Sequence, residues 1–229
     1  MELQECLGIL ETKGDPSVRR TYLNSGAKEP LIGVKMGDLR LLAKTIKIDH
    51  ALALALYASG IHDAMLLAGM VCDEAKLTRE TLELWISQAN CPSIAERCVA
   101  PLVAPRNDVW EIADAWANSQ EEMRACAGFA IYGMLFSYLP DQKLDLEFVK
   151  EIIENIESRI KREKPYLQYA MNNCLIMAGI YIHPLSTYCL AVADRIGYVK
   201  PTLKINNCNI QSASDYIKRY APRTKMKSL

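Results

Sequence analysis

Apolar residues recur every three or four positions along most of this chain, in stretches of roughly 10 to 18 residues joined by short turns. In residues 35–48, for example, Met36, Leu39, Ala43 and Ile46 fall on one face of a helix. Only residues 198–205 have extended character, and it is weak. Each helix therefore has an apolar face that needs a neighbour, and the pattern predicts an all-α protein.

Local signals mark where several of these helices begin and end. Thr78 is a suitable N-cap, Ser119 is another, and Pro92 stands where proline is tolerated at a helix start. Gly60 is a suitable residue to follow a helix. The predicted helices cover 35–48, 51–58, 61–72, 78–88, a segment from 92, a segment from 107 through 116, and 120–137, 145–164, 165–182, 184–196 and 210–219.

Short helices with tight turns favour an α–α superhelix, that is, a HEAT-like or armadillo-type solenoid of stacked antiparallel helix pairs. The internal sequence repeat is weak, so this prediction depends on the rhythm of the helices, and a compact irregular helical domain is the alternative. We expect one helical-repeat domain over residues 1–229, ending in a short basic tail at about 218–229.

The charge balance limits the choice of partners. The chain has 27 Lys and Arg and 27 Asp and Glu, so its formal net charge is zero. Proteins that bind nucleic acid usually carry an excess of cations, which neutralise phosphates. A basic face balanced by an acidic one remains compatible with zero net charge. No apolar stretch is long enough to cross a bilayer, so no membrane partner is expected.

Eight cysteines are spread along the chain without a CxxC pair or a Cys/His cluster at zinc spacing. Most lie among Ala, Leu and Ile, where a thiol acts as a small hydrophobic group. No signal peptide is recognisable, so we expect a cytoplasmic protein with reduced thiols. No metal site and no nucleotide-binding motif is present in the sequence, and we expect no cofactor.

A collinear series of segments resembles the AlkD-type DNA alkylation repair proteins over nearly the whole chain. The series begins with Gly33-Val34, a Leu39-Arg40 pair and Ala43, and continues through His62 and the apolar residues after it. The matching segments are 33–44, 50–56, 59–68, 124–130, 170–175, 193–197 and the tail positions Cys208, Ala213, Tyr216 and Ile217.

This resemblance implies a HEAT-like solenoid whose concave groove holds duplex DNA. Active members are glycosylases that remove N3- and N7-alkylated purines without metal or cofactor, using a carboxylate flanked by tryptophans to stabilise the cationic sugar. Counted from Trp85, the second family tryptophan falls at Pro92 and the catalytic Asp at Glu96. Glu96 is thus the candidate catalytic residue. Alternatively, it is a solvated or ion-paired helix residue, with Arg97 next to it.

The DNA-contacting positions implied by the resemblance are also altered. Arg124 stands one step from the family's arginine pair, where it either touches phosphate or pairs with Glu121 or Glu122. Met65 stands where an arginine is expected. In an apolar helix, Asn172 and Asn173 either face a groove or cap a buried carbonyl. The candidate DNA-binding residues are Arg97, Arg124, Lys164, Asn172 and Asn173.

Two further features have a structural and a functional interpretation. Trp110 and Trp116 lie six residues apart, and packing is favoured over a place in the groove. The basic C-terminal residues Lys218, Arg219, Arg223, Lys225 and Lys227 form either a solvated tail or an arm that contacts phosphate.

Three functions follow from these observations. The chain is a glycosylase for alkylated purines, a non-catalytic relative that binds double-stranded or branched DNA, or a helical-repeat scaffold for a protein or peptide. The losses around Glu96 and the zero net charge weaken the first. Fold alone does not decide among them.

Overall fold

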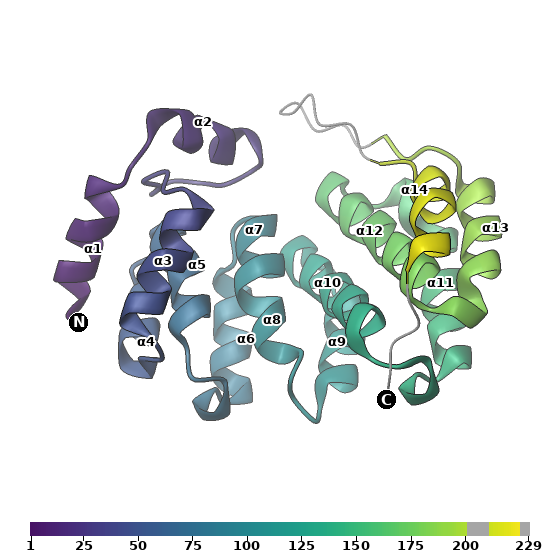
Figure 1. Cartoon of the computed structure of the whole chain (residues 1–229), viewed down its shortest axis with the longest axis horizontal. Helices are drawn as coiled ribbons and strands as arrows, with labels where there is room; N and C mark the ends of the chain where they lie inside the picture. The colour runs from purple at the N-terminus through teal and green to yellow at the C-terminus, as the bar shows by residue number, and fades with distance from the viewer. Residues whose placement is uncertain (201–210, 225–229) are drawn as a thin grey trace. The chain divides into compact units, whose positions relative to one another are not determined.

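The computed structural model describes residues 1–200 and 211–224, and within them the chain is helical (Figure 1). An isolated bridge joins Gly14 and Val34, and the described residues contain no strand. The predicted all-α fold is confirmed. The chain divides into two compact units, residues 1–107 and 108–229. In a solenoid each repeat contacts only its neighbours, so a single domain can also be divided into compact units between repeats. The prediction of one domain therefore stays a prediction.

The first unit consists of helices and short helical turns. They are α1 (Leu3–Thr12), α2 (Pro16–Asn24), α3 (Met36–Ile46), α4 (His50–Ala58), α5 (His62–Val71), η1 (Glu74–Lys76), α6 (Arg79–Gln88), α7 (Pro92–Ile94), η2 (Ala95–Val99) and α8 (Ala100–Val103). Within this unit α5 packs against α3, α4 and η2, and α6 packs against η2.

The second unit also consists of helices and short helical turns. They are α9 (Val109–Ala117), α10 (Glu122–Tyr138), η3 (Asp141–Lys143), α11 (Leu146–Arg159), η4 (Ile160–Arg162), α12 (Pro165–Tyr181), η5 (His183–Leu185), α13 (Ser186–Ile196), α14 (Ala213–Tyr220) and η6 (Ala221–Arg223). Here α10 and α12 lie side by side, α10 packs against α9, and α12 packs against α11, α13 and α14.

Capping side chains define several of the helix starts. The Thr78 hydroxyl accepts a hydrogen bond from the Thr81 N–H, as its place in the sequence predicts. Asp49 and Asp145 cap α4 and α11 in the same way. Gly60 follows α4 with a φ of +69°, in the left-handed region that glycine occupies without strain. Local chemistry therefore sets these boundaries.

The structure corrects several predicted boundaries. No helix is predicted before residue 35, yet α1 and α2 precede it, α2 beginning with Pro16 after the N-cap Asp15. The predicted helix 145–164 is α11 followed by a short 3-10 turn. Much of the predicted tail is also helical, because Lys218 and Arg219 belong to α14 and Arg223 to η6. Lys225, Lys227, Cys208 and residues 201–205 lie outside the described residues.

The described cysteines serve as core residues. Cys6, Cys72, Cys91, Cys98, Cys126, Cys174 and Cys189 are all free and buried. Burial raises the pKa of several of these thiols, Cys98 and Cys174 among them, which keeps them protonated. No single helix in the described ranges is long and apolar enough to cross a membrane, and only the pair Pro165–Tyr181 and His183–Ile196, bent by 110°, meets that criterion when combined.

Close approach of α9 and α10 requires a residue without a side chain at position 128. A Cβ on Gly128 would lie 2.2 Å from the Ala117 nitrogen and 2.6 Å from its Cα. Gly128→Ala should therefore destabilise the protein by about 1–3 kcal/mol, measured by chemical unfolding. A matched control is Gly133→Ala on the same helix, whose Cβ would meet only flexible Met177 atoms at 3.4 Å. It should be neutral or stabilising by up to about 1 kcal/mol; equal losses in both variants would contradict this account.

Candidate nucleic-acid interface

The segment that holds Glu96 is a π-helical turn, Ala95–Val99, between two short α-helical pieces. The Ala100 N–H donates to the carbonyl of Ala95, five residues earlier. Pro101 explains the irregularity, because it lacks an N–H and its ring clashes with the carbonyl four residues before it in a regular helix. Such a turn inserts one residue and changes the direction of the side chains around it.

Glu96 is half-buried, and its Oε1 atom is buried without a hydrogen-bond partner. Burial raises the pKa of Glu96 to about 7, although the charge of Arg97 acts to lower it. The alternative that Glu96 is solvated or ion-paired is therefore wrong for this oxygen. Arg97 itself is exposed. A carboxyl group in this environment is only partly ionised near neutral pH.

The π turn is held against α5 by close backbone contact. The Cys98 thiol donates to the Met65 carbonyl at 3.0 Å. A Cβ on Gly69 would lie 2.9 Å from the Cys98 sulfur, so α5 presents bare backbone at this point. Met65, which stands where the resemblance implies an arginine, is buried with 3% of its surface exposed. This position therefore offers apolar packing in place of a phosphate contact.

A buried histidine stands at the start of α5, beside the start of α7. The His62 ring has its Nδ1 3.6 Å from the Cys91 sulfur and its Nε2 3.4 Å from the Ser93 hydroxyl. The Tyr22 ring lies 5.4 Å from it, centroid to centroid. Burial lowers the pKa of His62, although Asp63 acts to raise it. His62 is thus neutral near neutral pH and adds no charge for phosphate.

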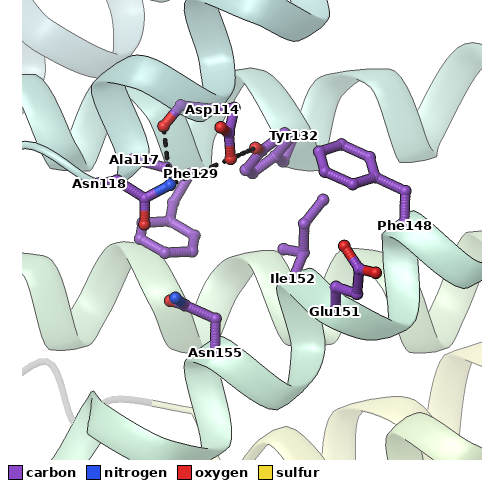
Figure 2. Close-up of a pocket in the computed structure, with 9 residues that line it drawn as sticks. All are labelled: Asp114, Ala117, Asn118, Phe129, Tyr132, Phe148, Glu151, Ile152 and Asn155. Atoms are coloured by element: carbon purple, nitrogen blue, oxygen red, sulfur yellow. Dashed lines mark hydrogen bonds between the residues drawn. The ribbon is translucent and has the colours of Figure 1, made fainter.

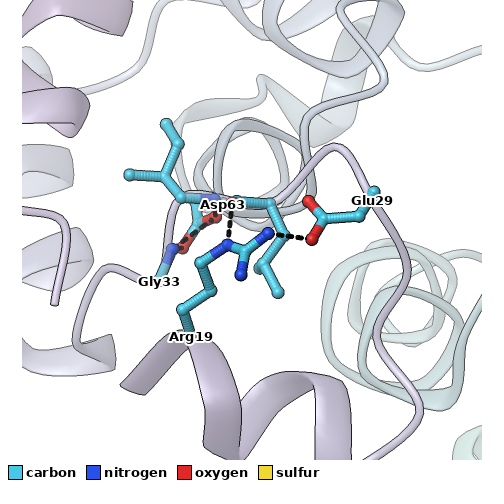
Figure 3. Close-up of polar contacts among 6 residues, drawn as sticks. Arg19, Glu29, Gly33 and Asp63 are labelled. Carbon is cyan, nitrogen blue, oxygen red and sulfur yellow. Dashed lines mark hydrogen bonds and ion pairs between the residues drawn. The ribbon is translucent and has the colours of Figure 1, made fainter. Parts of the chain in front are cut away.

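Asp63 anchors the loop before α3 (Figure 3). Its carboxylate accepts hydrogen bonds from the backbone N–H groups of Ile32 at 2.8 Å, Val34 at 2.7 Å and Gly33 at 3.2 Å. Gly33 has a φ of +96°, and a Cβ there would lie 2.6 Å from the Cβ of Arg19. All of these donors are backbone N–H groups of one loop, so the Asp63 carboxylate has a structural role.

In the second unit, a hydrogen bond brings the first turns of α10 and α12 together. The Tyr166 N–H donates to the Glu122 carboxylate at 3.1 Å, so an anion already occupies the start of α12. Lys164, the residue just before α12, is exposed. We call the residues Arg124, Lys164, Tyr169 and Asn173 the α10–α12 edge.

Arg124 is largely covered by its own neighbours. Its Nε atom donates to Glu121 at 3.1 Å, and its guanidinium lies 5.9 Å from the centre of the Trp116 ring. Only 18% of its side chain is exposed. The predicted pairing with Glu121 is confirmed, and a phosphate would have to compete with that carboxylate for Arg124.

The two asparagines of α12 have different environments. Asn172 is buried and donates to the carbonyl of Gln211 at 3.1 Å, which confirms the carbonyl-capping interpretation for this residue. Asn173 is half-buried. Tyr169, one helical turn before Asn173, keeps 39% of its surface exposed. An aromatic ring, an amide and a lysine thus stand along the first half of α12.

The tryptophans are packing residues. Trp85 is buried and stacks on Tyr57 at 4.0 Å between ring centres. Trp116 is buried, and Trp110 lies 6.0 Å from Phe148 in an edge-on arrangement. The prediction that Trp110 and Trp116 pack is confirmed. No tryptophan flanks Glu96 in sequence, and the position implied for one is Pro92.

The sequence does not identify Tyr169 or Asp63 as a candidate site residue. Asp63 follows His62 at the start of a helix just after Gly60. In a single sequence this pattern looks the same as an ordinary helix start. The sequence gives no signal for Tyr169, because its exposure depends on how α12 packs. No group of three or more metal-binding side chains lies together in the described ranges.

The fold defines a helical-repeat protein. The model of the family described as DNA alkylation repair enzyme matches residues 8–221. The chain belongs to this DNA alkylation repair family, as the collinear segments predict.

The chain is also similar to individual proteins over most of its length. Uncharacterized protein Lmo0209 of Listeria monocytogenes is 27% identical, with 94% of this chain and 96% of that protein covered. Uncharacterized protein Lin0241 of Listeria innocua is 26% identical, with 92% and 93% covered. A solved structure is also similar, with 27% identity, a TM-score of 0.91, and 100% of this chain and 99% of that chain covered. It is described as representing a new family of proteins related to the HEAT-like repeat DNA glycosylases, with affinity for branched DNA structures. The HEAT-like fold prediction is therefore confirmed.

The raised pKa of Glu96 predicts a pH-dependent stability. Because the folded state favours the protonated acid, stability is greatest below the ordinary pKa of 4.5 and falls as pH rises to about 7. The full cost of ionisation is up to about 3 kcal/mol. Glu96→Gln stays neutral, so its gain in unfolding free energy over the unmodified protein should be near zero at pH 4.5 and grow by pH 8. Urea unfolding at both pH values tests this, and a gain independent of pH would contradict it.

Proposed function

We propose that this protein binds DNA, with preference for branched or otherwise distorted structures, and does not excise alkylated bases. The proposal combines its place in the DNA alkylation repair family with the altered site around Glu96. It corresponds to the non-catalytic alternative derived from the sequence. A glycosylase and a protein-binding scaffold are the competing functions.

The environment of Glu96 supports binding over excision. Stabilising a cationic sugar requires a carboxylate that stays ionised beside it. Burial raises the pKa of Glu96 to about 7, and its Oε1 atom has no donor to hold the charge. The family's flanking tryptophan position is Pro92, which has no π face to add. Together these features support a site without excision chemistry.

Binding is supported by the similar structure with affinity for branched DNA and by the α10–α12 edge. Lys164 is exposed and can neutralise a phosphate. Tyr169 presents part of an aromatic ring to solvent, and an unpaired base can stack on such a ring. Bases at a branch point are less completely stacked than those in a duplex. A weakly basic surface with an exposed ring therefore favours branched DNA over linear duplex.

DNA binding also agrees with the predicted cytoplasmic location and with the predicted absence of a metal or cofactor. In the cytoplasm the buried thiols would stay reduced, and binding of this kind needs no metal or cofactor. Zero net charge predicts moderate affinity, with a shallow dependence on salt. A protein partner is compatible with the same proposal.

We expect no release of free base from duplex DNA that carries 7-methylguanine. Chromatography of the reaction products, with an active family glycosylase as the positive control, tests this directly. Glu96→Gln should behave like the unmodified protein in the same assay. Release of 7-methylguanine that disappears in Glu96→Gln would overturn the proposal and assign Glu96 the catalytic role.

Tyr169→Ala should weaken binding to a four-way junction by roughly 1–3 kcal/mol, and binding to a linear duplex of equal length by less. Gel shift or fluorescence anisotropy at fixed salt measures both. Tyr138→Ala is the matched control, because Tyr138 is also an exposed tyrosine, 47% accessible, but stands at the far end of α10. Equal losses in the two variants would remove Tyr169 from the interface.

A charge variant tests the phosphate contact separately. Lys164→Ala should weaken binding to junction and duplex alike and reduce the slope of log affinity against log salt by about one. Lys143→Ala removes an exposed lysine from η3 and serves as its control. An unchanged salt slope in Lys164→Ala would show that this lysine does not contact phosphate.

A further inference from the structure

A small cavity of about 180 Å³ lies in the second unit, among α9, α10 and α11 (Figure 2). Its walls are aromatic and aliphatic, and they include the buried Phe129, Tyr132 and Ile152. Its rim carries the exposed side chains of Asp114, Asn118 and Glu151. The volume suits a side-chain-sized group rather than a whole nucleotide.

The polar atoms around this cavity are mostly acceptors. The Tyr132 hydroxyl and the Asn118 amide both donate to Asp114, at 3.2 and 3.0 Å, so these two donors are already used within the protein. Glu151 reaches the cavity from α11. The Asn155 Oδ1 atom is buried without a hydrogen-bond partner. A ligand that fits must therefore bring several N–H donors.

The acceptors and rings together select a positively charged, flat ligand. Two carboxylates from different helices, Asp114 on α9 and Glu151 on α11, favour a cation. Aromatic faces favour a cation that can stack, which distinguishes a guanidinium from an ammonium group. Arg159 shows the same chemistry within the chain. Its guanidinium lies 5.7 Å from the centre of the Phe129 ring and donates to the Ala117 carbonyl, and both residues line the cavity.

We propose that this cavity binds a guanidinium group, held by Asp114, Glu151 and Asn155 against the ring of Phe148. The group belongs either to a small guanidine compound or to an arginine side chain of a protein partner. An acidic rim repels phosphate, so this site is separate from any DNA-binding surface. The inference does not depend on the proposed function.

Methylguanidinium and its uncharged analogue methylurea are the first pair of probes, followed with the full-length protein by NMR. Methylguanidinium should bind with a dissociation constant of about 1 mM and shift the side-chain amide signals of Asn118 and Asn155. The Trp110 indole should also shift, because its ring lies about 6 Å from those of Tyr132 and Phe148. Methylurea should produce no localised shift. Equal binding of both probes would overturn the proposal.

Conservative variants test the assigned residues. Asp114→Asn and Glu151→Gln should each weaken methylguanidinium binding at least about threefold, because each removes one carboxylate charge. Glu154→Gln is the matched control, since it removes an exposed carboxylate from the same helix outside the cavity lining. An equal loss of methylguanidinium binding in Glu154→Gln would show that only the total charge of the protein matters, and it would exclude a specific site. All three variants should bind junction DNA no more weakly than the unmodified protein.

A peptide distinguishes the two sources of the guanidinium group. An acetylated Gly-Arg-Gly amide that binds at least tenfold more tightly than methylguanidinium supports a protein partner. Equal or weaker binding of the peptide supports a small-molecule ligand. If the citrulline peptide, which lacks the charge, binds as tightly as the arginine peptide, the proposal is wrong for both sources.

Discussion

Pro101 imposes the constraint on which the candidate site depends. A proline cannot donate to the carbonyl four residues earlier, so the chain before it widens into a π turn at Ala95–Val99. The turn is fixed against α5 because Gly69 has no side chain and the Cys98 thiol bonds to the Met65 carbonyl. Glu96 is consequently held in a setting that disfavours its charge. The carboxyl group of Glu96 is therefore protonated more readily than an exposed glutamate.

The second unit divides its charges between different surfaces. Near the start of α12, Lys164 is exposed, whereas Glu122 already satisfies the Tyr166 N–H. The cavity beside α9 and α11 gathers carboxylates and aromatic rings instead. A protein with zero net charge can therefore have one surface that attracts anions and another that attracts cations. One surface suits phosphate and the other suits a cation.

Much of the fold could be predicted from the sequence because helix signals are local. The apolar period, the Thr78 cap and Gly60 each act within a few residues. Helix α2 was not predicted although Asp15 and Pro16 mark its start, because it has no buried residue and hence no strong apolar stripe. Helix α1 was not predicted either, although it buries Cys6 and Leu10. For the candidate site, the resemblance to the family placed the candidate catalytic residue at Glu96. Helix neighbours predicted that Arg124 pairs with Glu121 or Glu122, and it pairs with Glu121.

The sequence by itself determined the helical class and the family, since these depend on residue identity and order. Tertiary structure alone decided which polar groups face water. It buried Oε1 of Glu96, aimed Asn172 at the Gln211 carbonyl and left Tyr169 exposed. The physical reason is that a pKa or an exposed ring depends on atoms brought close from distant parts of the chain, and a single sequence does not give their distances.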